Sequence, residues 1–180
     1  MRHQDSSWRI VEGVATNLNL LRALAELDIH PDLICGTSIG ALVGAAYAVD
    51  ELERLEEWVL GMKVGELLRF VDVSLSAGLI NGERLTEYLR NNFGDRPIES
   101  MALPYAAVAT RLSSGAEVWL RSGSIVDAIR ASIALPGIFK PIAADGDFLV
   151  DGGLVNPVPV SLARALGADI VIAVDLNTDL

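Results

Sequence analysis

Two hydrophobic patterns alternate along the chain, one with the spacing of a helix and one made of short apolar runs. Residues 14–28 carry leucines at positions 20, 21, 24 and 27, which predicts an amphipathic helix. Residues 32–35 and 168–176 are short and apolar, as buried strands are. Because helices and buried strands alternate, we expect an α/β fold with three layers, α/β/α, around a mainly parallel central sheet.

The same patterns assign most of the remaining chain. Helices are predicted over residues 38–49, with an extension or a second helix through 51–62, and over 81–94, 124–135 and 159–167. Strands are predicted over 105–112 and 116–121, joined as a hairpin, and within 145–153 after a turn. Residues 60–80 have no clear pattern and are a candidate lid. No linker interrupts the sequence, so residues 1–180 are predicted to form a single domain.

Composition and charge narrow the classes of function. The 180 residues are 51% hydrophobic and carry a net charge of −10, so we expect neither binding to nucleic acid nor electrostatic docking to anionic lipid. Transient apolar contact with a membrane surface is compatible with this charge. Cys35 is the single cysteine, which excludes an internal disulfide and favours a reducing compartment. Since the sequence has no signal-peptide pattern and no apolar run of about 20 residues, we expect a cytoplasmic protein.

Residues 36–40 read Gly-Thr-Ser-Ile-Gly, the G-x-S-x-G pattern of a serine nucleophile on a strained turn between strand and helix. Gly36 and Gly40 leave room for such a backbone. Gly40, Gly44 and Ala48 share one helix face, which predicts close packing on the sheet. The start of the helix directs N–H groups, among them that of Ile39, toward a developing oxyanion. The alternative is that Ser38 only caps the helix.

A histidine base in the Ser–acid–His order of α/β-hydrolases is excluded, because His3 and His30 both precede Ser38. His30 falls in the connection before the strand at 32–35, and His3 lies at the terminus. A carboxylate is then the natural candidate for the base. Residues 36–44, Gly-Thr-Ser-Ile-Gly-Ala-Leu-Val-Gly, lack the lysine of a P-loop and the G-x-G-x-x-G spacing of a dinucleotide site. We expect no cofactor and no metal.

Asp151 is the favoured carboxylate because it ends an apolar strand and precedes Gly152 and Gly153. Ligands of open α/β sheets gather at the carboxyl ends of the strands. The alternative is an ordinary Asp-Gly turn. Asp175, at the end of another apolar run, is the main rival, and Asp145 and Asp147 are weaker candidates.

With these residues the chain resembles the patatin-like phospholipases, most of all the small bacterial branch of that family. The resemblance rests on the combination of G-T-S-I-G-A with a distant D-G-G-x-x-N-P-x-P, together with "AAVATRLSSGAEVWLRSG" and "AIRASIALPGIFKPI". It extends from about residue 20 to 176. Members of this family are lipid acyl hydrolases with a Ser–Asp dyad and no catalytic histidine.

The resemblance implies a role for each matching residue. Ser38 would be the nucleophile and Asp151 the base that takes its proton, through an acyl-enzyme intermediate on a lipid or simple ester. Residues 131–142 would line the substrate groove, although they can also be plain core and loop. The supporting residues would be Ile39, Gly36 and Gly40 around the oxyanion, Gly152, Gly153 and Asn156 in the acid loop, and Pro136, Gly137, Ile138 and Phe139 in the groove.

The first residues depart from the family pattern. The family opens with a strand and a glycine-rich G-G-G-x-R-G loop that forms the oxyanion hole, whereas residues 6–21 contain only Gly13, with Arg9 four positions before it. Residues 1–13 are therefore atypical or truncated. Three explanations stay open: an inactive or repurposed homologue, a truncated or mis-started enzyme, or a different backbone that supplies the donors.

Two functions follow from these patterns. The first is a serine acyl hydrolase that cleaves lipid, phospholipid or simple carboxylic esters. The second is a catalytically weak or inactive homologue that acts as a lipid-binding or regulatory domain. The sequence does not specify the headgroup or chain length of the substrate, or the oligomeric state.

Overall fold

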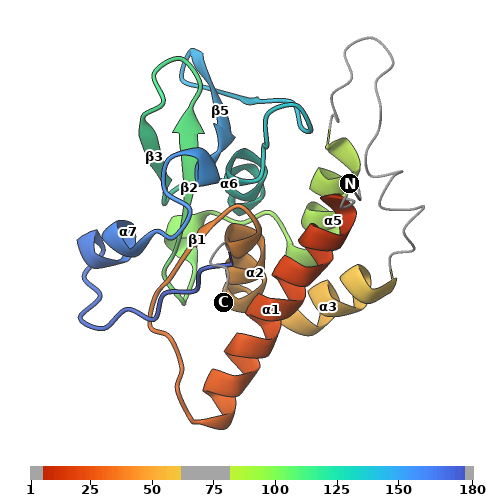
Figure 1. Ribbon diagram of the computed structural model, residues 1–180, viewed down its shortest axis with the longest axis vertical. Coiled ribbons are helices and arrows are strands. Elements are labelled where there is room, and N and C mark those ends of the chain that lie inside the picture. Colours follow the sequence, from red (N-terminus) through yellow and green to blue (C-terminus); the bar gives the residue numbers. More distant parts are fainter. Residues whose placement is uncertain (1–5, 62–81, 177–180) are drawn as a thin grey trace, which may run out of the picture.

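The computed structural model describes residues 6–61 and 82–176 (Figure 1). Its helices are α1 (Ser6–Glu26), α2 (Ile39–Ala48), α3 (Leu52–Gly61), α5 (Glu83–Phe93), α6 (Ile125–Ser132) and α7 (Val160–Ala165), with 3₁₀ turns at Ile98–Ser100 and Gly152–Leu154. Its strands are β1 (Ile34–Thr37), β2 (Tyr105–Arg111), β3 (Glu117–Leu120), β4 (Ile142–Ala144) and β5 (Asp147–Asp151). The lid expected within 60–80 falls almost entirely outside the described residues.

The arrangement of strands around β2 brings two carboxyl ends together. Thr37, the last residue of β1, pairs with Val108, and Asp151, the last residue of β5, pairs with the next residue, Ala109. β3 pairs with β2 over residues 107–110 and therefore occupies the other edge of that strand. β1 is parallel to β2 whereas β5 is antiparallel to it. β1 and β5 consequently run toward each other along one edge of β2 and stop where they meet.

Helices cover both faces of this sheet, which confirms the expected α/β/α layers. α2 packs against β1, and α6 against β2 and β5, with α1, α3 and α5 farther out. On the opposite face lies α7, whose Leu162 packs on Ala106 and Val108 of β2. Figure 1 shows α7 on the side of the sheet away from α1, α3 and α5. The sheet itself is mixed, since β1–β2 is its parallel pair and β2–β3, β2–β5 and β4–β5 are antiparallel.

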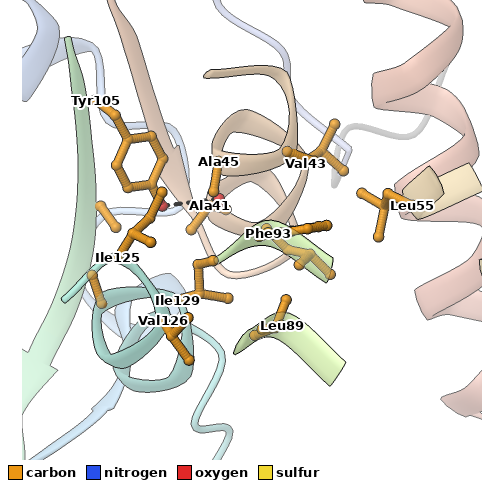
Figure 2. Packing of buried hydrophobic residues seen from close by; sticks show 14 of the residues in the cluster. Ala41, Val43, Ala45, Leu55, Leu89, Phe93, Tyr105, Ile125, Val126 and Ile129 are labelled. Carbon is orange, nitrogen blue, oxygen red and sulfur yellow. Dashed lines mark hydrogen bonds between the residues drawn. The ribbon is translucent and has the colours of Figure 1, made fainter. Parts of the chain in front are cut away.

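The main core lies between α2, α5 and α6. Leu89 and Phe93 of α5 meet Ile125 and Ile129 of α6 there, and all four side chains are almost completely buried (Figure 2). The hydroxyl of Tyr105 donates a hydrogen bond of 2.9 Å to the carbonyl oxygen of Ala41 in α2. This bond ties the start of β2 to the first turn of the helix that follows β1.

The prediction of a strand at residues 168–176 is wrong. This segment forms no strand, and Ile170 and Ile172 are 85% and 54% exposed. An apolar run becomes a buried strand only when a neighbouring strand accepts its backbone hydrogen bonds. Within the described part of the chain β1 pairs with β2 alone, and a cavity of about 2100 Å³ has walls that include both β1 and this segment. Residues 168–176 therefore lie across this space from β1 and have no strand partner within residues 6–61 and 82–176.

The other predicted elements are largely confirmed. The hairpin of β2 and β3, the helix closed by Gly94 and the N-cap of α6 at Ser124 are all present. Of the two alternatives for the helical region that starts near residue 38, the structure has the second, with two helices within residues 39–61. β4 was not anticipated, because three residues are too short a run to give a period. Among the described residues, no helix combines the length and the apolar character needed to cross a bilayer.

Gly36 in β1 and Gly40 in α2, which flank the turn at Ser38, differ in how closely they are packed, and this makes them a matched pair for mutation. A Cβ on Gly36 would lie 2.4 Å from the carbonyl oxygen of Gly40, while a Cβ on Gly40 would have nothing within 4 Å. Close packing of this helix on the sheet therefore depends on Gly44, where a Cβ would lie 2.6 Å from Cγ2 of Ile34.

We predict that Gly36→Ala lowers the free energy of unfolding by about 1–3 kcal/mol, the usual cost of overpacking. Gly40→Ala should leave it unchanged or raise it by up to about 1 kcal/mol, because alanine favours the helix. Urea denaturation of both variants measures the difference. Equal losses of stability in the two variants would contradict the close approach of β1 and α2.

Candidate active site

Ser38 occupies the turn where β1 passes into α2. It is half-buried, and its φ of 54° and ψ of −122° are a strained conformation for a residue with a side chain. Its hydroxyl makes no capping bond to α2. Instead, Oγ of Ser38 donates a hydrogen bond of 2.7 Å to Oδ2 of Asp151. The structure therefore departs from the alternative in which Ser38 serves only as a helix cap.

Asp151 accepts this bond from a buried position at the end of β5. Asp151 is only 3% exposed. Its other carboxylate oxygen, Oδ1, accepts a hydrogen bond of 2.7 Å from the N–H of Gly153. Burial raises the pKa of Asp151 above its usual 3.8, while the bonds from Ser38 and Gly153 favour the ionised form and partly offset that rise. The result is a carboxylate that is more basic than an exposed aspartate and already bonded to a hydroxyl.

The backbone of Asp151 is held as firmly as its side chain. Its N–H donates to the carbonyl oxygen of Ala134 at 3.0 Å, and its own carbonyl oxygen accepts the hydroxyl of Thr110 at 2.8 Å. After it the chain passes close to β2, and a Cβ on Gly152 would lie 2.2 Å from the carbonyl oxygen of Val108. Glycine at 152 is thus required by this close approach.

The predicted supporting residue Asn156 joins the two loops of the site. Its backbone carbonyl accepts the hydroxyl of Thr37 at 2.8 Å, and its backbone N–H donates to Gly152 at 2.9 Å. Its side chain donates to Glu117 at 2.8 Å and to Ser161 at 3.1 Å. Asn156 therefore links the end of β1 to the loop that follows Asp151.

Two backbone donors lie beside the serine. Within the part of the chain that is described, the N–H groups of Ile39 and Gly40 have no acceptor, as is usual for the first turn of a helix. They lie at the positive end of the α2 dipole, where negative charge is stabilised. Arg9 and Gly13, the residues in the region of the family's glycine-rich loop, lie within α1. That region is helical here.

The four predicted groove residues sit on the connection from α6 to β4. Pro136 and Gly137 are exposed and Ile138 and Phe139 are half-buried, with the ring of Phe139 5.6 Å from the guanidinium of Arg130. The walls of the large cavity include Leu135 but not residues 136–139. Ser38 and Asp151 do contribute to those walls, together with apolar side chains of α1. The described space next to the dyad is thus bordered by α1 and β1 instead.

Of the rival residues, His30 and Asp175 border the same large cavity as Ser38 and Asp151, whereas Asp147 does not. His30 is exposed in the connection before β1, 3.5 Å from Asp28, and His3 is outside the described residues. Asp147, the first residue of β5, accepts a hydrogen bond from the hydroxyl of Ser113 in the turn between β2 and β3. Asp175 is exposed in the segment after α7. No group of three or more histidine, cysteine, aspartate or glutamate side chains in the described ranges is placed to hold a metal ion.

The turn at Ser38 has one polar contact that was not predicted from the sequence. Oγ of Ser132, the last residue of α6, accepts the N–H of Ser38 at 2.9 Å. Ser132 is completely buried, and a serine inside an apolar helical pattern is the signal that could have singled it out.

A strained serine at a strand–helix turn, bonded to a buried carboxylate and next to free N–H groups, defines the class of α/β hydrolase-like domains with a Ser–Asp pair. The comparisons with known proteins identify the family. A family model described as patatin-like phospholipase matches residues 15–164. The chain belongs to the patatin-like phospholipase family, which is a family of lipid hydrolases.

Individual relatives agree with this assignment. The chain is 38% identical over 162 residues to an uncharacterized NTE family protein of Mycobacterium tuberculosis, covering 89% of this chain and 45% of that protein. It is 35% identical over 169 residues to patatin-like phospholipase domain-containing protein 7 of Mus musculus, and 33% identical over 171 residues to domain-containing protein 6 of Homo sapiens. Those matches cover 89% and 91% of this chain but 12% of each mammalian protein. The chain thus spans less than half the length of these relatives.

The raised pKa of Asp151 gives a prediction about stability. Because folding raises this pKa, the folded protein holds the proton more tightly than the unfolded chain. Ionisation of Asp151 therefore lowers stability at neutral pH, and this cost disappears as the pH falls through the folded-state pKa toward 3.8. The melting temperature of Asp151→Asn, relative to that of the wild type, should therefore be higher at pH 7 than it is at pH 4.5. The difference between the two proteins shifts in favour of the variant as the pH rises.

Thermal unfolding of both proteins between pH 4.5 and 7 measures the difference between their melting temperatures. The other carboxylates are the same in both proteins, so their contributions cancel in this difference. A difference that stays constant with pH would show that Asp151 titrates as an exposed aspartate does.

Proposed function

We propose that this domain hydrolyses carboxylic esters of lipids, with Ser38 as the nucleophile and Asp151 as the general base. The observation that carries the proposal is the 2.7 Å hydrogen bond from Oγ of Ser38 to Oδ2 of Asp151. A nucleophile and a base within hydrogen-bond reach are the minimum for acyl transfer. The similarity to patatin-like phospholipase domain-containing proteins supports a lipid as the substrate.

The first half of the reaction forms an acyl-enzyme. Oγ of Ser38 attacks the ester carbonyl carbon while its proton moves to Oδ2 of Asp151. The carbonyl oxygen becomes an oxyanion that accepts the N–H of Ile39, at the positive end of α2. The intermediate collapses, Asp151 returns the proton to the leaving alcohol oxygen, and the acyl group remains on Ser38.

The second half repeats these steps with water. Asp151 takes a proton from a water molecule, whose oxygen attacks the acyl carbon. Collapse of the second intermediate returns that proton to Oγ of Ser38 and releases the fatty acid. One carboxylate thus serves as base and acid in both halves, for which a pKa raised by burial is better suited than that of an exposed aspartate.

Hydrolysis of p-nitrophenyl butyrate and octanoate tests the proposal. Ser38→Ala should abolish turnover, and Asp151→Asn should lower kcat/KM by about 10²–10⁴-fold, the usual contribution of a general base. Ser113→Ala is the matched control, since its hydroxyl is exposed and bonds Asp147 in another hairpin. Turnover that survives Ser38→Ala would overturn the assignment of the nucleophile.

Fatty-acid release from phosphatidylcholine in mixed micelles then separates lipid from simple esters. We expect release that depends on Ser38 and declines as the pH falls through the raised pKa of Asp151, because a protonated carboxyl cannot accept the serine proton. Turnover of p-nitrophenyl esters without release from the phospholipid would restrict the activity to simple esters.

A second candidate is a lipid-binding domain with little turnover. The observation that favours it is α1, whose helix includes Arg9 and Gly13, so that residues 6–26 form no glycine-rich turn that could supply oxyanion donors. Loss of one oxyanion donor costs about 10²–10³-fold in kcat. Binding to phosphatidylcholine vesicles without release of fatty acid would favour this candidate over the hydrolase.

A further inference from the structure

The strained turn at Ser38 needs an external contact to hold it. Positive φ at a residue with a side chain costs of the order of 1–3 kcal/mol and persists only where the surroundings fix it. The carbonyl oxygen of Ser38 is bound from within α2, by the N–H of Ala41 at 3.0 Å. The other side of the turn depends on the N–H of Ser38, whose acceptor comes from a different helix.

That acceptor is Oγ of Ser132, 2.9 Å away. Ser132 is the last residue of α6 and is 0% exposed. α6 is itself well anchored, with Ser124 as its N-cap accepting the N–H of Asp127, and with Ile125 and Ile129 completely buried in the core. The oxygen that Ser38 binds is thus fixed to a rigid part of the fold.

The same short segment also holds the base. Two residues after Ser132, the carbonyl oxygen of Ala134 accepts the N–H of Asp151 at 3.0 Å. Ser38 directly follows β1 and Asp151 ends β5, and these two strands meet end to end without pairing to each other. Their shared neighbour β2 and the bond from Thr37 to Asn156 therefore set the distance between the two residues only coarsely. Residues 132–134 add a direct link to the backbone of each of them.

We propose that Ser132 is a positioning residue of the esterase reaction. It fixes the N–H of Ser38, so that the hydroxyl points at Asp151 and the N–H of Ile39 is directed at the oxyanion. This inference rests on the proposed function of the dyad, although the contact it describes is measurable without substrate. Ser132 itself does not touch the reacting atoms.

The test compares Ser132→Ala with Ser124→Ala, a variant of the same helix that removes its N-cap far from Ser38. A displacement of about 1 Å in an active site can cost roughly 10²-fold in rate. We therefore expect Ser132→Ala to lower kcat for p-nitrophenyl butyrate by about 10- to 100-fold with KM nearly unchanged. Ser132→Thr keeps the hydroxyl and should recover most of the kcat lost in Ser132→Ala. Ser124→Ala should keep the wild-type kcat while melting at a lower temperature than the wild type.

Amide hydrogen exchange of Ser38, followed by NMR, gives a readout that needs no activity. The Ser38 amide should exchange faster in Ser132→Ala than in the wild type and remain protected in Ser124→Ala. Unchanged exchange in Ser132→Ala, or a loss of kcat that merely parallels melting temperature in both variants, would overturn the proposal. If Ser38→Ala retains wild-type turnover, the proposed function of Ser38 and Asp151 is refuted instead. The exchange experiment alone then decides whether Ser132 fixes the turn.

Discussion

The hydrogen bond between Ser38 and Asp151 depends on a single feature of the sheet, the head-on meeting of β1 and β5 along one edge of β2. The registers place Thr37 opposite Val108 and Asp151 opposite Ala109, so the two strands end at consecutive residues of the same neighbour. Neither strand can extend without colliding with the other. The chain must turn away at both ends, and the two turns carry the serine and the carboxylate.

The fold accepts several local costs to keep this junction closed. Ser38 adopts a positive φ, and Asp151 is a carboxyl group taken out of water. Gly36 and Gly152 remove the Cβ atoms that would collide with neighbouring backbone. Strain, buried charge and unoccupied helix N–H groups in one place are typical of sites that have been kept for chemistry at the expense of stability. The buried hydrogen bond from Thr110 to the carbonyl oxygen of Asp151 and the partly buried one from Ser38 to Ser132 offset part of that cost.

The sequence predicted the α/β/α layers and most helices, and it singled out Ser38 and Asp151, which the structure joins by a hydrogen bond. G-x-S-x-G and the apolar run before Asp151 are local signals, and this is why a single sequence could show them. Its reason for placing Asp151 in the site was incomplete. Asp151 does lie at the carboxyl end of a strand, as expected, but β5 is antiparallel to β1, a direction that no local pattern encodes. Residues 168–176 have the pattern of a buried strand, yet burial also needs a partner edge, which sequence period cannot supply. The contact between Ser132 and Ser38 was not predicted either, since it joins residues 94 positions apart.

The most direct test of the central claim is the rate at which a fluorophosphonate modifies Ser38, measured against pH in the wild type and in Asp151→Asn, with the modified residue located by peptide mass spectrometry. If Asp151 accepts the serine proton, modification of the wild type rises with pH through one ionisation above 3.8, the usual pKa of an aspartate, and is slow and without that step in Asp151→Asn. Equal rates in the two proteins, or modification of a residue other than Ser38, would contradict the account.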